Sequence, residues 1–263
     1  NKGLQIFGTV TKSSVTTGSE VMAYSGFNAT NYLHSPAQPN HPFSFARGDF
    51  NLTFWAKVTS TDPDRLWFCI GDYSTSSING GVNSIRVIQL NSGGDGDTTY
   101  FYSGSDYVAT TSEDGLWHQW CFFRKDGIIY LYKDAVLQGS APSLTSIIGP
   151  DTWGATIGTA PQNGVPFAYG ADYLSLFRIS ATPPFSEEQI KKIYNDEKSL
   201  FLENTSCTLY GSSNTVTALA YDDSTSLLHV GTSSGRSDFT GLKRINHTTS
   251  AVSTAISAQD GLI

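Results

Sequence analysis

The stretch GGDGDTTYFYSGSDY, residues 93–107, gathers the side chains whose chemistry is easiest to interpret. Two carboxylates separated by one glycine, Asp95 and Asp97, can supply oxygen ligands to a hard cation such as Ca²⁺. No later bidentate carboxylate completes a calcium-loop spacing, so a plain solvated turn is the competing interpretation. Three tyrosines suited to contacting a sugar follow: Tyr100, Tyr102 and Tyr107. We therefore predict a contact surface here, with a glycan as ligand and Ca²⁺ as the one candidate cofactor.

Two tryptophans, Trp55 and Trp153, extend the candidate glycan site. In GDFNLTFWAKV, residues 48–58, one side of an extended chain is apolar, and Trp55 points to the other side. A sugar ring has an apolar C–H face and a hydroxyl rim, so an aromatic ring beside polar groups is a suitable partner. The alternative is that Trp55 is covered by the N-terminal segment or by a helix. Trp153, in the turn PDTWGA, is expected to be partly exposed.

The remaining reactive residue types do not predict catalysis. His118 stands between Trp117 and Trp120 without a Ser or Cys partner pattern, so we expect a hydrogen-bonded structural histidine. Glu187 and Glu188 fall at a predicted helix start, where acids interact favourably with the helix dipole. The glycines of GTSSGRS lack the lysine of a phosphate-binding loop. The chain is therefore predicted not to be an enzyme.

Composition limits the partners and the fold. The 263 residues include 23 acidic and 16 basic side chains, a formal charge of −7 that disfavours nucleic acid. No apolar run approaches the roughly 20 residues that span a bilayer, so we expect no membrane insertion. Only 15% of residues are charged, and Gly, Ser, Thr and aromatic residues are plentiful. This composition favours many short strands over a helical bundle.

The three cysteines, Cys69, Cys121 and Cys207, are odd in number and widely spaced, which argues against a disulfide framework and a zinc site. Buried free thiols at Cys69 and Cys121 are the preferred interpretation, and a bridge between these two is the alternative. The chain opens at Asn1 and its only methionine is Met22, so we expect an excerpt or a processed product.

Alternating apolar residues predict strands along most of the first 180 residues. Asp126-Gly127 separates two apolar runs, a strong signal for a tight hairpin turn. One helix follows, in SEEQIKKIYNDE, where Ser186 and Gln189 have the spacing of a capping box. We place a domain end near Phe201. Beyond it, three short strands separated by turns resemble one blade of a β-propeller, which cannot bury both faces alone and so requires a partner.

Four motifs carry a family resemblance: GDFNLTFWAKV, LWHQWCFFRKDGIIYLYKDAVLQG, ATIGTAPQNGVPFAYGADYLSLFRIS and SEEQIKKIYNDE. Together they resemble the concanavalin A-like, laminin G-type jelly roll over roughly residues 15–200. The resemblance implies an all-β, two-sheet antiparallel sandwich with one C-terminal helix and a lectin-like role. The chain departs from the family in having Asp134-Ala135 where a turn usually has Asp-Gly. Glucanases with this fold use two closely spaced glutamates on one strand, and that pattern is missing here.

The flanking segments, GTVTKSSVTTGSEVMAYSGF and the tail from Thr208 to Ile245, are similar to virion proteins of tailed phages, especially marine ones. This similarity implies a tail fibre or a tail- or capsid-associated protein, located on the virion and outside the cell. Its partners would be further copies of the chain (a trimer, for example), other virion proteins and a host-surface glycan.

We predict a jelly-roll domain over residues 1–201, with an N-terminal strand segment over 1–20, and a β appendage over 202–263. Two rival interpretations remain: a carbohydrate-binding module of a secreted bacterial enzyme or adhesin, and a degraded or atypical glycoside hydrolase.

Overall fold

The computed structural model describes residues 4–16, 19, 21–38, 41–59, 64–71, 84–90, 98–111, 114–143, 154–162, 165–167, 170–181, 185–202, 208–254, 257–258 and 261–262. The chain divides into two compact units, which are described separately. The first unit comprises Asn1–Ser13 and Ala23–Asp196, and the second comprises Ser14–Met22 and Glu197–Ile263. Across the described part of the chain, no helix is both long and apolar enough to cross a membrane.

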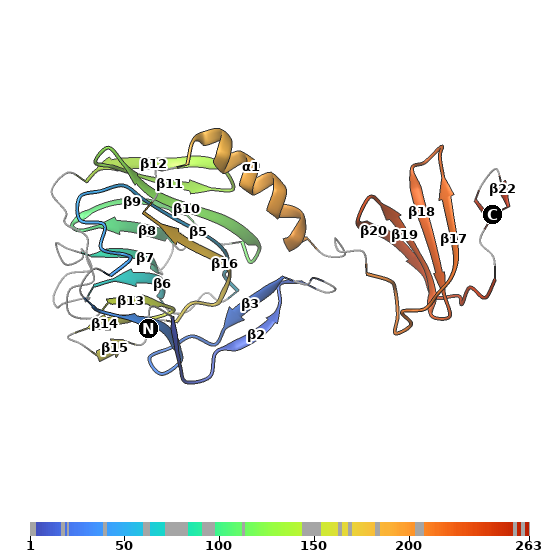
Figure 1. The fold of residues 1–263 in the computed structure, drawn as a ribbon, viewed down its shortest axis with the longest axis horizontal. Coiled ribbons are helices and arrows are strands. Elements are labelled where there is room, and N and C mark those ends of the chain that lie inside the picture. The colour runs from blue at the N-terminus through green and yellow to red at the C-terminus, as the bar shows by residue number, and fades with distance from the viewer. Residues whose placement is uncertain are drawn as a thin grey trace. The chain divides into compact units, whose positions relative to one another are not determined.

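The first unit is a sandwich of two antiparallel sheets, as the sequence predicted (Figure 1). Sheet A consists, in spatial order, of β1 (Gln5–Phe7), β4 (Tyr32–Pro36), β13 (Gly154–Ile157), β6 (Arg65–Ile70), β7 (Ile85–Leu90), β8 (Thr98–Ser103) and β9 (Asp106–Thr111). Sheet B consists of β12 (Val136–Pro142), β11 (Ile128–Lys133), β10 (Trp117–Lys125), β5 (Phe50–Lys57), β16 (Tyr173–Ser180), β3 (Met22–Ser25) and β2 (Thr11–Ser14). A small hairpin joins β14 (Ala160–Gln162) to β15 (Val165–Phe167).

The main core lies between the two sheets and is built from the inward residues of each alternating strand. Leu52, Phe54 and Ala56 of β5 are each at most 2% exposed, which confirms the predicted inward face. Phe54 meets Trp67 of the facing sheet edge-on, with ring centroids 5.4 Å apart. Burying one such side chain contributes about 1.5–3 kcal/mol. The sandwich is therefore held together mainly by this apolar layer.

Helix α1 (Glu187–Glu197) packs on the outer face of sheet B (Figure 1). The predicted capping box is present: Ser186 N–H donates to Gln189 Oε1 at 2.8 Å, and Gln189 N–H donates to Ser186 Oγ at 3.3 Å. Ile190 is the buried residue of the helix and contacts outward side chains of β10 and β11. A short 3₁₀ helix, Lys198–Phe201, follows.

Two tight turns shape the β10–β11–β12 meander. Asp126 and Gly127 have φ of 51° and 75°, and Lys125 pairs with Ile128, so the predicted hairpin is confirmed. Asp134 and Ala135, between β11 and β12, have φ of 50° and 62°. Ala135 therefore adopts the left-handed backbone that usually favours glycine, without changing the fold.

Both described cysteines are buried and free. Cys69 belongs to an apolar cluster on the outer face of sheet A, whereas Cys121 belongs to the cluster under α1. The free-thiol prediction is confirmed, and the alternative of a Cys69–Cys121 bridge is wrong. Burial raises the pKa of the Cys121 thiol. Cys207 lies outside the described residues.

The second unit contains a four-stranded antiparallel meander of β17 (Val216–Asp222), β18 (Leu227–Thr232), β19 (Gly235–Thr240) and β20 (Lys243–Thr248). The sequence predicted three of these strands. Val230 and Phe239 are buried, whereas Leu219 and Tyr221 on β17 remain 55% and 52% exposed. A two-stranded pair, β21 (Ser257–Ala258) and β22 (Gly261–Leu262), lies further along the chain.

Candidate functional site

Three predicted site residues come together on the outer face of sheet A, and we call them the tyrosine cluster: Tyr100, Tyr102 and Tyr107. Tyr102 on β8 pairs directly with Tyr107 on β9, and Tyr100 lies two residues earlier on β8, so all three point to one face. Ring centroids are 5.7 Å apart for Tyr100–Tyr102, 5.3 Å for Tyr102–Tyr107 and 5.7 Å for Tyr100–Tyr107. The three rings therefore form one contiguous aromatic surface.

The members of the tyrosine cluster differ in access to solvent. Tyr107 is 50% exposed and Tyr100 is half-buried, whereas Tyr102 is only 2% exposed. The guanidinium of Arg86, on the neighbouring β7, lies 4.7 Å from the centre of the Tyr102 ring. The prediction that Tyr102 contacts a ligand directly is therefore corrected. Because Tyr102 is packed between Arg86 and the other two rings, it supports the exposed surface of Tyr107 and Tyr100.

Trp55 lies away from this surface. It is 2% exposed and stacks on Tyr194 of α1, with centroids 5.9 Å apart and ring planes 13° from parallel. The helix thus covers Trp55, so the glycan-contact prediction for this residue is wrong and the covered-face alternative holds. Trp153, Asp95 and Asp97 lie outside the described residues, and their proposed roles stay predictions. Within the described segments, no three His, Cys, Asp or Glu side chains are grouped closely enough to hold a metal ion.

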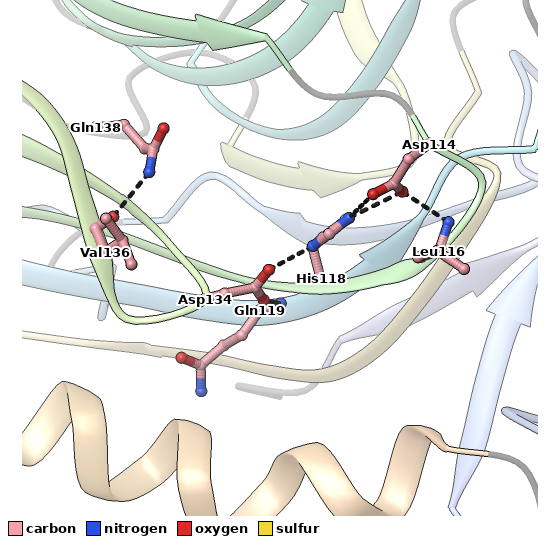
Figure 2. Close-up of polar contacts among 7 residues, drawn as sticks. All are labelled: Asp114, Leu116, His118, Gln119, Asp134, Val136 and Gln138. Carbon is pink, nitrogen blue, oxygen red and sulfur yellow. Dashed lines mark hydrogen bonds and ion pairs between the residues drawn. The ribbon is translucent and has the colours of Figure 1, made fainter.

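His118 lies between two carboxylates, and we call Asp114, His118 and Asp134 the histidine clamp (Figure 2). Nδ1 is 2.5 Å from Asp134 Oδ2, and Nε2 is 2.9 Å from both carboxylate oxygens of Asp114. Asp134 also accepts the Gln119 N–H, and Asp114 accepts the Leu116 N–H, each at 2.9 Å. The clamp therefore joins the loop before β10 to the β11–β12 turn.

The surroundings of His118 favour its charged form. Burial on its own would lower the pKa of His118, but hydrogen bonds to Asp134 and Asp114 outweigh it and the pKa is raised. The imidazolium that faces two carboxylates donates from both nitrogens, so neither nitrogen keeps a lone pair with which to accept a proton. His118 is hydrogen-bonded as predicted, and this geometry suits a structural role rather than general-base catalysis.

A cavity that the sequence analysis missed lies at one end of the sandwich, and we call it the end pocket. Its volume is about 390 Å³, and its lining comes from residues 25–28, Thr59, Asp64, Arg65 and residues 170–173. Arg65 begins β6 of sheet A and Tyr173 begins β16 of sheet B, so the pocket lies where the two sheets meet. The residues come from separate segments of the chain, and no local motif in the sequence joins them.

Family and structural comparisons agree with this architecture. The model of the concanavalin A-like lectin/glucanases superfamily (laminin G type) matches residues 27–190. Because this match covers more than half of the chain, the protein belongs to that family. No curated protein sequence matches the chain.

Solved structures with this fold share little sequence with the chain. The receptor-binding domain of the botulinum neurotoxin C/D mosaic serotype is 12% identical with a TM-score of 0.52, over 94% of this chain and 60% of that domain. The binding domain of botulinum neurotoxin serotype D is 12% identical with a TM-score of 0.51, over 94% of this chain and 58% of that one. CBM40 of the Ruminococcus gnavus IT-sialidase, bound to alpha2,3 sialyllactose, is 11% identical with a TM-score of 0.50, over 69% of this chain and all of that one. These likenesses establish a lectin-like fold.

Proposed function

We propose that the first unit is a non-catalytic glycan-binding domain whose contact surface centres on Tyr107 and Tyr100. The observation that carries the proposal is an exposed ring, Tyr107, held in place by aromatic neighbours and by Arg86 beneath Tyr102. A ring already fixed by its neighbours loses little conformational entropy when a sugar stacks on it. Its phenol group can also hydrogen-bond to the hydroxyl rim of the sugar.

The chemistry of the described residues supports binding rather than turnover. Both nitrogens of His118 are engaged with carboxylates. The family's hydrolytic pattern, two glutamates about 5 Å apart on one strand, has no counterpart in the sequence. Measurable hydrolysis of a β-glucan that disappears on replacing one carboxylate would favour the rival hydrolase interpretation.

A paired-variant experiment tests the glycan surface. Wild-type protein is first screened on a broad glycan array, and the best ligand is then titrated calorimetrically against Tyr107→Ala and Tyr221→Ala. Tyr221 is the matched control, since it is a strand tyrosine of the second unit that is 52% exposed, against 50% for Tyr107. Losing one stacked ring weakens binding about twofold to tenfold, and the control leaves it unchanged. Equal affinities for both variants, or a silent array, would contradict the proposal.

We also propose a setting for this domain: a structural component of a phage tail fibre or of a tail- or capsid-associated assembly, acting in host attachment or particle decoration. The similarity of the flanking sequences to virion proteins supports this setting. So do the exposed apolar side chains Leu242 and Ile245 in the β19–β20 hairpin, which a second copy of the chain could cover. Light scattering is expected to give a homo-oligomer, and a compact monomer would count against the virion setting.

The alternative setting is a carbohydrate-binding module of a secreted bacterial enzyme or adhesin. This alternative shares the glycan-binding prediction and differs in assembly, since a module of that kind works as a monomer tethered to a larger chain. Neighbouring capsid or tail genes would favour the phage setting, and a fused catalytic domain would favour the module.

A further inference from the structure

The end pocket has the size and position of a small-molecule site. Its volume of about 390 Å³ falls in the lower part of the range usual for ligand pockets, about 300–1,000 Å³. Such a volume suits one sugar unit better than a long chain. The pocket lies at the end of the sandwich, whereas the tyrosine cluster lies on the outer face of sheet A, so the two surfaces are different.

A fixed carboxylate lies in this pocket. The Arg65 side chain is 2% exposed, and its Nε donates to Asp172 Oδ1 at 3.1 Å. Asp172 Oδ2 accepts the Thr59 N–H at 2.7 Å and the Thr59 hydroxyl at 3.4 Å. A carboxylate offers about four acceptor positions, and the Asp172 side chain is 20% exposed, so it can still accept a hydrogen bond from a ligand hydroxyl. Asp64 places a second carboxylate in the lining.

Apolar walls complete the pocket. Phe27 is 6% exposed, and the half-buried Tyr173 meets Trp117 edge-on with centroids 6.4 Å apart. A Cβ added at Gly170 would overlap the backbone carbonyl of Phe27, so the two walls touch and only glycine permits the approach. Rigid aromatic walls beside hydrogen-bond acceptors match the C–H face and the hydroxyl rim of a sugar ring.

The charged side chains in the pocket lining favour a neutral sugar over a charged one. Two carboxylates, Asp64 and Asp172, accompany one guanidinium, Arg65, and the whole chain carries a formal charge of −7. An acidic sugar would meet net repulsion. A hard cation such as Ca²⁺ needs about six to eight oxygen ligands, and no three His, Cys, Asp or Glu side chains of the described residues are grouped so as to hold one. Neutral hydroxyl groups, which donate to carboxylates without adding charge, fit best.

We propose that the end pocket is a second carbohydrate site that binds one neutral sugar unit through adjacent hydroxyl groups. These hydroxyls donate to Asp172 and Asp64, and the sugar ring lies against Tyr173. The inference rests on the proposed glycan-binding function but uses a surface independent of Tyr107. A single sugar unit makes few contacts, so its Kd is expected to be about 1–10 mM.

Amide chemical-shift mapping of the full chain tests this site. Methyl glycosides of neutral hexoses and pentoses, N-acetylneuraminic acid, glucuronic acid and CaCl₂ alone are each titrated to about 50 mM, high enough to reveal millimolar binding. We expect at least one neutral glycoside to shift the amides of residues 25–28, 59 and 170–173, and the acidic sugars and Ca²⁺ to leave them unchanged.

Two variants and one control assign the shifts to the pocket. Thr59→Trp places an indole at the exposed rim, and Asp64→Ala removes one carboxylate while keeping the Arg65–Asp172 pair. Each should weaken the neutral-sugar response at least fivefold with the other cross-peaks unchanged. Thr240→Trp, at an exposed threonine of the second unit, should leave the response intact.

The outcomes separate this site from the tyrosine cluster. If Tyr107→Ala removes array binding but the end-pocket amides never respond, the pocket proposal fails and the proposed function stands. If the end-pocket amides respond while Tyr107→Ala leaves array binding unchanged, the pocket proposal stands and the proposed contact surface at Tyr107 fails. Equal responses to acidic sugars or to Ca²⁺ alone would also overturn the assignment to a neutral sugar.

Discussion

The histidine clamp makes stability depend on pH in a direction that the structure fixes. Replacing His118 by glutamine removes the hydrogen bonds to Asp134 and Asp114, while each carboxylate keeps one backbone N–H partner. Hydrogen bonds to charged groups contribute about 1.5–3 kcal/mol each. The Asp114 side chain is 43% exposed, so that pair is discounted to about 0–1 kcal/mol. The Asp134 side chain is 26% exposed, so its bond keeps a value of about 1.5–3 kcal/mol, and the two bonds together contribute about 1.5–4 kcal/mol.

The sign follows from the two pKa shifts. The pKa of His118 is raised in the folded state, so its stabilisation is fully present below its unfolded pKa of about 6.5 and is lost as pH rises through the folded value. Burial would raise the pKa of Asp114, yet the hydrogen bond from His118 and its other interactions lower it. The Asp114 contribution is therefore present above about pH 4 and is lost as pH falls through its folded pKa. The clamp stabilises the first unit most between about pH 4.5 and 6.5.

Urea unfolding at pH 5.5 and pH 9, followed by tryptophan fluorescence, measures this effect. All five tryptophans, Trp55, Trp67, Trp117, Trp120 and Trp153, belong to the first unit, so the signal reports on that unit. The His118→Gln variant should lose about 1.5–4 kcal/mol of unfolding free energy at pH 5.5 and clearly less at pH 9. Asp114→Asn is the milder control, with a loss of about 0–1 kcal/mol. A loss that does not change with pH, or that grows at pH 9, would refute the charged clamp.

Three further outcomes test the packing. Ile190→Ala should destabilise the first unit by about 2–4 kcal/mol and change the emission of Trp55, because it removes the buried side chain that holds α1 on sheet B. An unchanged urea midpoint and unchanged emission would contradict the packing of the helix on the sheet. Ala135→Gly should stabilise the first unit by about 1 kcal/mol, since glycine adopts a φ of 62° without steric cost. Ala56→Gly, in the regular strand β5, should destabilise the same unit. The same urea titration compares the unfolding free energies of the two variants. In a Cys207→Ser background, Cys121 should not react with a thiol reagent until the protein unfolds, because the side chain is buried and burial raises the pKa of its thiol. Rapid labelling of Cys121 in the folded protein would contradict that burial.

Local patterns predicted the parts of the fold that depend on short-range rules. The two faces of β5 follow from period-two alternation, the Asp126-Gly127 turn from its backbone preference, and the helix start from the Ser186–Gln189 capping box. Each of these features is decided within about ten residues of chain. The structure confirms all three with the predicted residues in the predicted roles.

Features decided between distant segments could not be predicted in the same way. Trp55 and Tyr107 both look like exposed aromatic residues beside polar neighbours, but α1 lies over only one of them. The end pocket depends on a contact between Arg65, the first residue of β6 in sheet A, and Asp172, in the bend just before β16 of sheet B. Neither the covering of Trp55 nor the formation of the end pocket can be recognised from a local sequence pattern, because both depend on how distant elements pack together.

The position of the helix also bears on where recognition can occur on the sandwich. The outer face of sheet B is occupied in its centre: Ile190 packs on the outward residues of β10 and β11, and Tyr194 stacks on Trp55 of β5. An aromatic residue there stabilises the helix contact and has no surface left for a ligand. The tyrosine cluster, a contiguous aromatic surface with an exposed ring, is on the other sheet, where β8 and β9 lie at the edge of sheet A. A glycan bound by this domain should therefore shift the amides of β8 and β9 and leave those of α1 unchanged. The outer face of sheet A presents an exposed aromatic ring, whereas the helix covers the centre of the outer face of sheet B.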